Sequence, residues 1–501
     1  MPHTPSPHQR AVYKWVREAS GNLILVAVAG SGKTLTILNA STMMGGDVAI
    51  AAYNSKIAKE IQEKLKGAKV GANVRAGTFH SFGFRAWLNH CRDTKPVVDR
   101  DKVSNILIAQ KCPEAQQDFV LRLVSMAKNR AFGVICSMDD TEAWDYMIEH
   151  YNLDSSLPEG DDGLVREGID RAISAIAVSN EQCRKVVDFD DMLYAPLVHG
   201  IRMWQNNWLL VDEAQDTNPA RRELAKKMLM PSGRAIFVGD PKQAIYGFTG
   251  ADNDSLDRIK ADFDCSELPL TVTYRCPKAV VQLARQYVSH ITAAESAPEG
   301  VVAGLTAAQF TSQPPEAFTY SAAMLCRNTA PIVSQAFALI RRGIACHVEG
   351  KEIGRGLLNL TRKWQTGDLD VLRNKLEAYL KKEVAKFLEK KQDQKAEALT
   401  DKVSTLFVIM ENMEEDDTVK DLRDKIFKLF GDTPDGEAPK LFTFSTVHKS
   451  KGREWDTVYI LDRNKLMPSP MAKKDWEIEQ EYNLIYVAIT RSQGTLVDVV
   501  T

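Results

Sequence analysis

The sequence has almost no net charge and no apolar run of membrane-spanning length. Its 501 residues carry a formal charge of −2, which by itself gives no sign of a nucleic-acid partner. Because acidic surfaces elsewhere would hide a groove lined by Lys and Arg, this balance does not exclude such a partner. The longest apolar run near the amino terminus, LILVAVA at 23–29, is far too short to cross a bilayer. The terminal segment MPHTPSPHQR also lacks the apolar core of a signal peptide.

The eight cysteines are scattered and form no C-x-x-C pair, a usage typical of reduced thiols. We therefore expect a soluble intracellular protein of the cytoplasm (the host cytoplasm if the source were a virus) with no membrane partner. Hydrophobic content of 44% and charged content of 26% are those of an ordinary globular protein. The length allows roughly three or four compact domains.

Four apolar runs predict buried parallel strands, each followed by a polar or glycine turn and helix-like sequence. They are Leu23–Ala29, Val48–Ala52, Trp208–Val211 and Ala235–Val238. Between Phe84 and Asn207 the pattern is mostly helical and is broken by the acidic turn EGDDG at 159–163. We interpret this block as an insertion within the first α/β domain.

A second α/β domain is predicted to begin near Leu268, with strands at Ala323–Cys326, Leu441–Ser445 and Thr457–Leu461. From 368 to 430 there is neither Gly nor Pro, and Leu or Val recurs every four residues from Leu372 to Leu388, which predicts an amphipathic helix. Whether this insert is plainly structural or binds nucleic acid stays open. The predicted boundaries are 1–84 and 188–267 for the first domain, 85–187 for its insertion, 268–348 and 438–501 for the second domain, and 349–437 for its insertion.

Residues 27–34, AVAGSGKT, fit the phosphate-loop pattern that allows Ala at its first position. Gly30 and Gly32 would let backbone N–H groups curl around phosphate oxygens at a helix N-terminus. Lys33 would reach the β- and γ-phosphates, and the Thr34 hydroxyl would ligate Mg²⁺. A glycine-rich turn with an exposed lysine is the structural alternative.

A second motif, LLVDEAQD at 209–216, supports the phosphate-loop interpretation. An apolar strand that ends in two adjacent carboxylates is costly unless they meet a cation or act chemically. Asp212 would hold Mg²⁺, and Glu213 would deprotonate the attacking water. A solvated acid pair is the alternative, but together the two motifs predict nucleoside triphosphate hydrolysis.

The order of short motifs along the chain resembles that of the superfamily 1A helicases of the UvrD/Rep/PcrA type. The resemblance extends from Gln9 to Arg491 and is specific through the joint order of its motifs rather than through any one of them. The motifs are HQRAV at 8–12, AGSGKT, TFHSF at 78–82, DFDDML at 188–193, DEAQD, GDPKQAIY at 239–246, TYRCP at 273–277, TVHKSKGREWD at 446–456 and YVAITRS at 486–492.

The resemblance implies two RecA-like parallel-sheet domains, each interrupted by a largely helical insertion, with ATP and Mg²⁺ as ligands. It implies that Gln9 reads adenine and that Tyr274 stacks on the base. Gln243 would sense the γ-phosphate or the attacking water. The implied catalytic residues are Lys33, Glu213, Gln243, Arg275 and Arg491, the last two as arginine fingers. The implied nucleotide-binding residues are Gln9, Ala29, Gly30, Ser31, Gly32, Lys33, Thr34, Tyr274, Arg275, Gly452, Glu454 and Arg491.

The resemblance also implies a track for single-stranded DNA, built from side chains that contact the DNA backbone and aromatic rings that stack on the bases. Phe79 and Phe82 could equally belong to the core, which for Phe82 is the preferred interpretation. The implied contacts are Asn54, Lys56, Thr78, Phe79, His80, Tyr246 and Phe248 on the first domain and Arg327, Thr446 and His448 on the second.

The sequence departs from the family pattern at several places. Leu35 stands where the family commonly has Arg, and Gly247 and Thr249 replace two arginines that flank the aromatic residue of a motif often written YRWRGAD or YRFRGAD. The second insertion is shorter than in large family members. The sequence ends soon after Arg491, so we expect no nuclease module and no long carboxyl-terminal tail.

The sequence therefore predicts an ATP-dependent 3′→5′ DNA helicase that couples hydrolysis to movement along single-stranded DNA and to duplex unwinding. The polarity comes from the resemblance alone. One alternative is a single-stranded DNA translocase that displaces bound proteins with little unwinding. Another is a regulatory ATP-binding module that does not move, and RNA is a minor alternative substrate. The expected partners are single-stranded DNA and its junctions with duplex; protein partners stay open.

Overall fold

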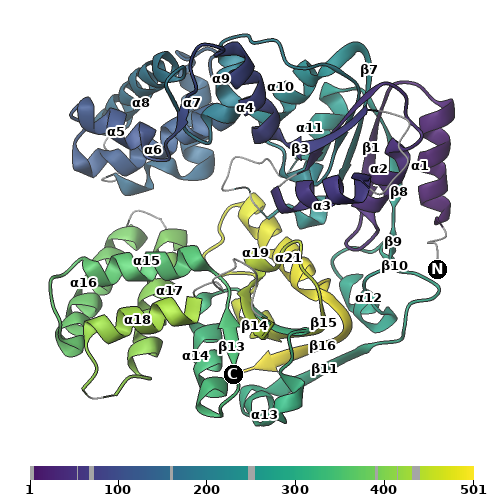
Figure 1. Ribbon diagram of the computed structural model, residues 1–501. Helices are drawn as coiled ribbons and strands as arrows, with labels where there is room; N and C mark the ends of the chain where they lie inside the picture. Colours follow the sequence, from purple (N-terminus) through teal and green to yellow (C-terminus); the bar gives the residue numbers. More distant parts are fainter. Residues whose placement is uncertain are drawn as a thin grey trace. The chain divides into compact units, whose positions relative to one another are not determined.

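The computed structural model divides the chain into two compact units, Met1–Thr271 and Val272–Thr501 (Figure 1). Both units are α/β with a six-stranded parallel sheet, so the predicted fold class is confirmed. Of the predicted track residues, Asn54, Tyr246 and Phe248 lie outside the described residues, as does the side chain of Lys56. The structure describes residues 5–52, 55–66, 73–157, 162–245, 247, 254–389, 393–414, 416–430 and 440–501.

The sheet of the first unit has the order β3-β2-β6-β7-β1-β8, with every neighbouring pair parallel. Its apolar runs at 23–29, 48–52, 208–211 and 235–238 are confirmed as strands. Strand β8 pairs with β1, so this sheet ends shortly after the predicted boundary at 267/268. The strands are β1 (Asn22–Ala27), β2 (Asp47–Ala52), β3 (Asn73–Thr78), β6 (Asn206–Val211), β7 (Leu229–Gly239) and β8 (Cys265–Leu270).

Helices cover both faces of this sheet, because alternate strand residues point to opposite sides. Leu23 and Leu25 face one core and Ile24 faces the other. The first core is closed by α1 (Pro7–Glu18), α2 (Lys33–Ser41) and α3 (Ser55–Lys66). The second is closed by α4 (Phe79–His90), α9 (Asp191–Val198), α10 (Pro219–Met228) and α11 (Ser255–Asp262).

The first insertion is a helical subdomain with a core of its own. The short parallel pair β4 (Val97–Val98) and β5 (Val186–Val187) lies where the chain enters and leaves it. Its helices are α5 (Lys102–Ala109), α6 (Glu114–Asn129), α7 (Thr141–Tyr151) and α8 (Asp162–Gln182).

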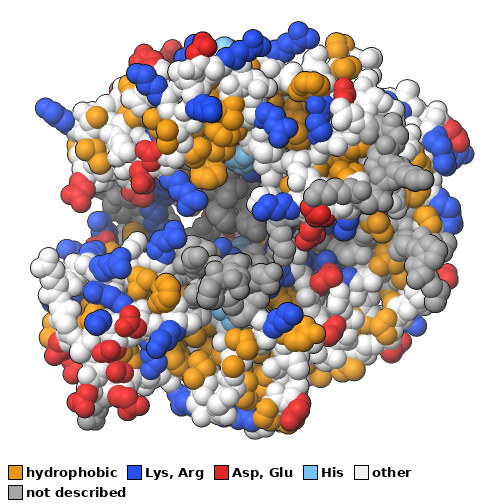
Figure 2. Space-filling view, in the orientation of Figure 1, with side chains coloured by type: hydrophobic (Ala, Val, Ile, Leu, Met, Phe, Trp, Pro, Cys, Tyr) orange, Lys and Arg blue, Asp and Glu red, His pale blue; other side chains and the backbone are white. Residues whose placement is uncertain are grey.

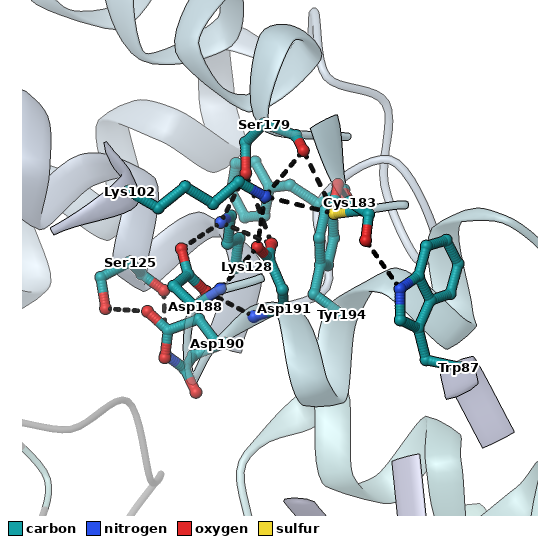
Figure 3. Close-up of polar contacts among 12 residues, drawn as sticks. Trp87, Lys102, Ser125, Lys128, Ser179, Cys183, Asp188, Asp190, Asp191 and Tyr194 are labelled. Carbon is teal, nitrogen blue, oxygen red and sulfur yellow. Dashed lines mark hydrogen bonds and ion pairs between the residues drawn. The ribbon is translucent and has the colours of Figure 1, made fainter. Parts of the chain in front are cut away.

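Two buried lysines join this insertion to α9 (Figure 3). Lys102 Nζ lies 2.6 Å from Asp191, and Lys128 Nζ lies 2.8 Å from Asp188 and 2.7 Å from Asp191. Burial lowers the pKa of the Lys128 ammonium, but the Asp191 and Asp188 carboxylates raise it more, so its net pKa is raised. The DFDDML motif at 188–193 therefore holds the insertion on the sheet domain through two cations and two anions.

The sheet of the second unit has the order β11-β16-β15-β12-β14-β13, again parallel throughout. The runs predicted near 323–326, 441–445 and 457–461 are confirmed as β12, β14 and β15. A separate parallel pair, β9 (Val272–Thr273) and β10 (Thr292–Ala293), begins the unit. The sheet strands are β11 (Val301–Thr306), β12 (Ala322–Cys326), β13 (Cys346–Val348), β14 (Phe442–Thr446), β15 (Trp455–Leu461) and β16 (Ser492–Val500).

The second insertion shares one continuous core with this sheet. In α16, Leu372 and Leu376 are fully buried whereas Leu388 is 46% exposed, so the predicted apolar stripe meets the core only along the first half of the helix. Asp401 of α17 accepts hydrogen bonds from the backbone N–H groups of Thr329 and Ala330, at the start of α14 (Thr329–Arg341). The insertion helices are α15 (Lys351–Arg362), α16 (Leu369–Glu389), α17 (Asp393–Met410) and α18 (Val419–Phe430).

The remaining helices complete the second unit. Within the described ranges, none of the chain's helices combines the length and the apolar character that crossing a bilayer requires. These last helices are α12 (Lys278–Ala284), α13 (Ala307–Ser312), α19 (Val447–Ser450), α20 (Arg463–Leu466) and α21 (Asp475–Ile489).

Candidate functional site

The predicted catalytic residues of the first unit follow strands that are neighbours in the sheet. Lys33 and Thr34 follow β1, Asp212 and Glu213 follow β6, and Gln243 follows β7, in a sheet that reads β6-β7-β1 at this point. Because parallel strands bring their carboxyl ends to one edge, Thr34 and Asp212 meet there although 178 residues separate them in the sequence. The predicted site residues of the first unit are thus brought together, whereas Arg275 and Arg491 belong to the second unit.

The loop between β1 and α2 has the backbone of a phosphate cradle. Gly30 and Gly32 have φ values of 69° and 76°, a region that residues with a Cβ rarely occupy. Ala29 and Ser31 are buried, and the Ser31 hydroxyl oxygen has no hydrogen-bond partner in the described part of the chain. A buried orphan hydroxyl in such a loop fits a missing polar ligand such as a phosphate oxygen.

The two residues predicted to hold Mg²⁺ are in direct contact. Thr34 Oγ1 donates a 2.6 Å hydrogen bond to Asp212 Oδ2. Burial raises the pKa of the Asp212 carboxyl to about 6, with a further rise from the Glu213 charge, while Thr34 and Lys33 oppose the shift. A divalent cation beside Asp212 would stabilise its charged form, so this oxygen pair fits Mg²⁺.

Glu213 is held in an unusual backbone conformation beside the phosphate loop. Its φ is 51°, in the left-handed region, and its carboxylate lies 3.7 Å from Lys33 Nζ. Gln215 Nε2 donates to Glu213 Oε2 at 2.5 Å, while Gln215 Oε1 accepts from the Asp240 N–H. Gln243 Nε2 in turn donates to Asp240 Oδ2 at 2.6 Å. One glutamine therefore connects the predicted general base to the segment that carries the predicted sensor.

Gln9 is anchored at both ends of its carboxamide. Its Oε1 accepts from the Ser6 N–H in the capping box of α1, and its Nε2 donates to Thr36 Oγ1 of α2 at 3.0 Å. The residue is only 1% exposed. Since an amide group has four hydrogen-bonding positions, these two contacts use one N–H and one lone pair of Gln9.

In the second unit, both predicted arginine fingers make contacts within that unit. Arg275 Nε donates to Glu454 Oε2 at 2.5 Å, and its Nη1 donates to the Thr490 carbonyl. Arg491 is 1% exposed and donates from Nε to the Val487 carbonyl at 2.9 Å.

The other nucleotide-binding residues predicted for this unit differ in exposure and backbone geometry. Tyr274 is 39% exposed. Gly452 has a φ of 82°, with open space where a Cβ would lie.

Three of the predicted track residues of the first unit are described, and they lie at the start of α4. Thr78 caps this helix through Ser81, and Phe79 is 5% exposed and packs in the core. His80 lines a small hollow together with Asp212 and Glu213. Burial lowers the pKa of the His80 imidazole to about 4, with a further effect of the Arg221 charge, so His80 is neutral at physiological pH. The hollow places a predicted track residue directly beside the predicted catalytic carboxylates.

The track residues predicted for the second unit follow two neighbouring strands. Arg327 follows β12 and Thr446 ends β14, and these strands pair as Cys326 with Thr446. Arg327 forms an ion pair with Glu481 at 2.9 Å. Burial lowers the pKa of the His448 imidazole to about 3, and Arg327 adds to this shift, so the two side chains are electrostatic neighbours.

Several residues that support the candidate site were not predicted from the sequence. Gln215 lies inside the quoted DEAQD motif, but only the fold reveals that it connects Glu213 with Asp240. No motif indicated Arg221 beside His80 or Glu481 against Arg327, because those pairs form between segments far apart in the sequence.

Two protein-family models match the chain. The UvrD/REP helicase N-terminal domain matches residues 7–264, and the UvrD-like helicase C-terminal domain matches residues 363–499. A probable DNA helicase II homolog of Mycoplasma pneumoniae is 28% identical over 298 residues, covering 55% of this chain and 41% of that protein.

Two further relatives give similar matches. The ATP-dependent DNA helicase Rep of Escherichia coli is 24% identical, with 57% of this chain and 43% of Rep covered. The ATP-dependent DNA helicase srs2 of Schizosaccharomyces pombe is 24% identical, with 53% and 33% covered. The chain spans less than half the length of each of these relatives.

Proposed function

Because this chain belongs to the UvrD/REP helicase family, we propose that it is an ATP-dependent DNA helicase that moves 3′→5′ along single-stranded DNA and separates duplex. ATP and Mg²⁺ are the proposed ligands, and single-stranded DNA with its junctions to duplex is the proposed substrate. The 3′→5′ polarity rests on family resemblance. The motor domains are proposed to be 1–84 with 188–267 and 268–348 with 438–501, and the insertions 85–187 and 349–437.

One observation carries this proposal: in the strand order of the first sheet, the predicted nucleotide residues and the predicted track residues follow neighbouring strands. The sheet runs β3-β2-β6, and the predicted DNA contacts follow β3 and β2 while Asp212 and Glu213 follow β6. His80 shares a hollow with both carboxylates. A movement of the segment proposed to contact DNA would therefore shift the surroundings of the Asp212 and Glu213 carboxylates directly, without passing through another domain.

We assign the hydrolytic step to groups already held in place. Lys33 neutralises charge on the phosphates, and Glu213 accepts a proton from the attacking water as that water bonds to the γ-phosphorus. The bond between the γ-phosphorus and the β–γ bridging oxygen breaks in the same step, so that ADP and phosphate are the products. Gln215 fixes the carboxylate that accepts this proton. Mg²⁺ held by Thr34 and Asp212 would supply further charge neutralisation. By family resemblance, the guanidinium groups of Arg275 and Arg491 are proposed to stabilise the transition-state charge.

The test is strand displacement on duplexes that carry a 3′ or a 5′ single-stranded tail, with a Lys33→Ala variant as the control. The proposal expects ATP-dependent unwinding from the 3′-tailed substrate only, and none with Lys33→Ala. Unwinding from the 5′ tail would contradict the polarity. Unwinding by Lys33→Ala at the wild-type rate would contradict the whole assignment.

A translocase that displaces proteins with little unwinding is a second candidate, favoured by one observation. The second insertion shares its core with the sheet of the second unit and caps α14 through Asp401, so it is built as part of that unit. Streptavidin displacement from end-biotinylated single strands, measured beside strand displacement, separates the two. Displacement of streptavidin without unwinding identifies the translocase.

A further inference from the structure

A second cavity lies at the opposite end of the first sheet from the nucleotide residues. Its volume is about 470 Å³, within the range of small-molecule and peptide-anchor sites. Asp47 and Asn206, the first residues of β2 and β6, line it, so it opens at the amino-terminal ends of the strands. The lining includes the charged, aromatic and apolar side chains of Arg75, Phe82, Arg85, Arg202, Met203 and Trp204.

One arginine of the cavity is fixed by three neighbours. The Arg75 guanidinium lies 4.3 Å from the centre of the Trp204 ring, donates to Asn206 Oδ1 at 3.2 Å and lies 3.6 Å from Asp47 Oδ1. Trp204 is nevertheless 63% exposed. A large aromatic side chain left this open, with a cation stacked on it, is the kind of residue that anchors partners.

Two further arginines have no counter-charge. Arg85 of α4 and Arg202 are exposed, and within the described ranges neither forms an ion pair with a carboxylate. The lining therefore holds three guanidinium groups against the single carboxylate of Asp47, on a chain whose net charge is −2. Figure 2 shows Lys and Arg side chains mixed with hydrophobic ones over α4, α10 and β7 of this unit. This local excess of positive charge selects an anionic ligand.

The floor of the cavity is apolar. It is formed by Phe82, Ala86, Met203 and Met228, of which Met203 is 5% and Met228 2% exposed. Methionine side chains adapt to the shape of an inserted apolar group.

Two of the three side-chain amides in the lining are already engaged, and the third, that of Asn89, is on an exposed residue. Asn206 Nδ2 donates to the Trp204 and Met228 carbonyls, and Gln205 Nε2 donates to the Leu229 carbonyl. A nucleobase inserted here would bury polar edges against side chains that offer few partners, at a cost in free energy. The floor therefore favours an apolar side chain over a base.

We propose that this cavity binds an acidic peptide segment of a partner protein. One large apolar side chain of the peptide fills the floor between Phe82 and Met203. Flanking carboxylates pair with Arg85 and Arg202 at the rim, where arginine can bind a carboxylate through two parallel hydrogen bonds. The site lies away from the nucleotide residues, so its occupation does not require ATP.

The test uses a fluorescein-labelled peptide of the sequence Asp-Asp-Asp-Phe-Asp-Asp and fluorescence anisotropy with the full-length chain. Two matched peptides carry Ser in place of Phe or Asn in place of every Asp. The protein variants are Arg85→Glu, Arg202→Glu and Trp204→Ala, with Arg17→Glu, an exposed arginine of α1, as the charge-matched control. Thermal midpoints and basal ATPase rates of the three variants should equal those of the wild type.

We expect the acidic phenylalanine peptide to bind the wild type and Arg17→Glu equally. Each of the three cavity substitutions should weaken binding at least about tenfold, and so should each change to the peptide. Equal binding of the serine peptide would overturn the proposal, because charge alone would then explain affinity. Tighter, Arg85-dependent binding of a labelled oligothymidylate would overturn it in favour of nucleic acid, and absence of any peptide binding would also overturn it.

Discussion

Thr34 Oγ1 and Asp212 Oδ2 lie 2.6 Å apart although 178 residues separate them in the sequence. The contact joins the start of α2 to the end of β6 and places a hydroxyl and a carboxylate where a phosphate-bound cation would sit. The backbone N–H of Glu213, next along the chain, donates to Asp212 Oδ1 at 2.9 Å, while its carboxylate accepts from Gln215 Nε2. The candidate hydrolytic site therefore consists of a candidate cation-binding pair and an adjoining candidate base whose carboxylate Gln215 orients.

Gln215 is predicted to act as a positioning residue for Glu213. Gln215→Ala removes the 2.5 Å hydrogen bond to Glu213 Oε2 and should lower kcat for ATP hydrolysis about 10- to 100-fold, with little change in the KM for ATP. Steady-state kinetics with saturating single-stranded DNA measure both parameters. Because Gln215 is buried, the thermal midpoint is recorded as a control. A parallel loss of ATP affinity would indicate that Gln215 shapes the binding site instead.

His80 is predicted to stay neutral far below the ordinary imidazole range. Its pKa is lowered to about 4, chiefly by burial, so between about pH 6.5 and pH 4 the unfolded state takes up a proton that the folded state does not. The contribution of His80 to stability is therefore present above about pH 6.5 and is lost as the pH falls towards 4. Side-chain NMR titration, with the His80 signal assigned by its absence in His80→Asn, checks this. An inflection near 6.5 for His80 would contradict the packing described for it.

Lys128→Met should destabilise the first unit strongly. The substitution leaves Asp188 without its ion pair and Asp191 with Lys102 alone, in a site where Lys128 is fully buried. Removing one partner of a buried ion pair typically costs about 3–5 kcal/mol of unfolding free energy. Urea unfolding measures this, with Lys185→Met as an exposed control. A loss below about 1 kcal/mol would mean that water or rearrangement compensates the carboxylates.

Arg275→Ala should abolish hydrolysis while leaving ATP binding nearly intact. An arginine that stabilises transition-state charge typically contributes about 10³-fold or more to the rate of phosphoryl transfer. Single-turnover hydrolysis and binding of a fluorescent ATP analogue separate the two effects.

Arg463→Ala is the matched control for Arg275→Ala, because Arg463 also pairs with a carboxylate, that of Asp498, within the second unit. Equal effects of the two substitutions on hydrolysis would show that Arg275 only stabilises its unit.

Most of the internal strands, but not β16, could be predicted from the sequence because they are buried on both faces and appear as continuous apolar runs. β1, β2, β12 and β14 are of this kind. The edge strands could not: β3, NVRAGT, carries Arg75 at its centre and is mostly half-buried. An edge strand has one neighbour and needs no continuous apolar run, so periodicity gives no signal for it.

The phosphate loop and the acidic strand end were predictable because each is a contiguous motif whose chemistry depends on local spacing. Contacts between motifs were not predictable. The hydrogen bond between Gln215 and the Asp240 N–H, and the hollow shared by His80 and Glu213, exist only because the sheet aligns β3, β6 and β7 in a particular order. The position of Phe79 was not predictable either, because both core and DNA-contacting positions accept an aromatic ring. In the structure Phe79 packs in the core.

The most direct test of the account is the rate of ATP hydrolysis, with and without single-stranded DNA, for the wild type and for Glu213→Gln. The substitution keeps the size of the side chain but removes its capacity to accept a proton from water. We predict DNA-stimulated hydrolysis in the wild type, and in Glu213→Gln a loss of about 10²-fold or more with ATP still bound. DNA-stimulated turnover at the wild-type rate in Glu213→Gln would contradict it.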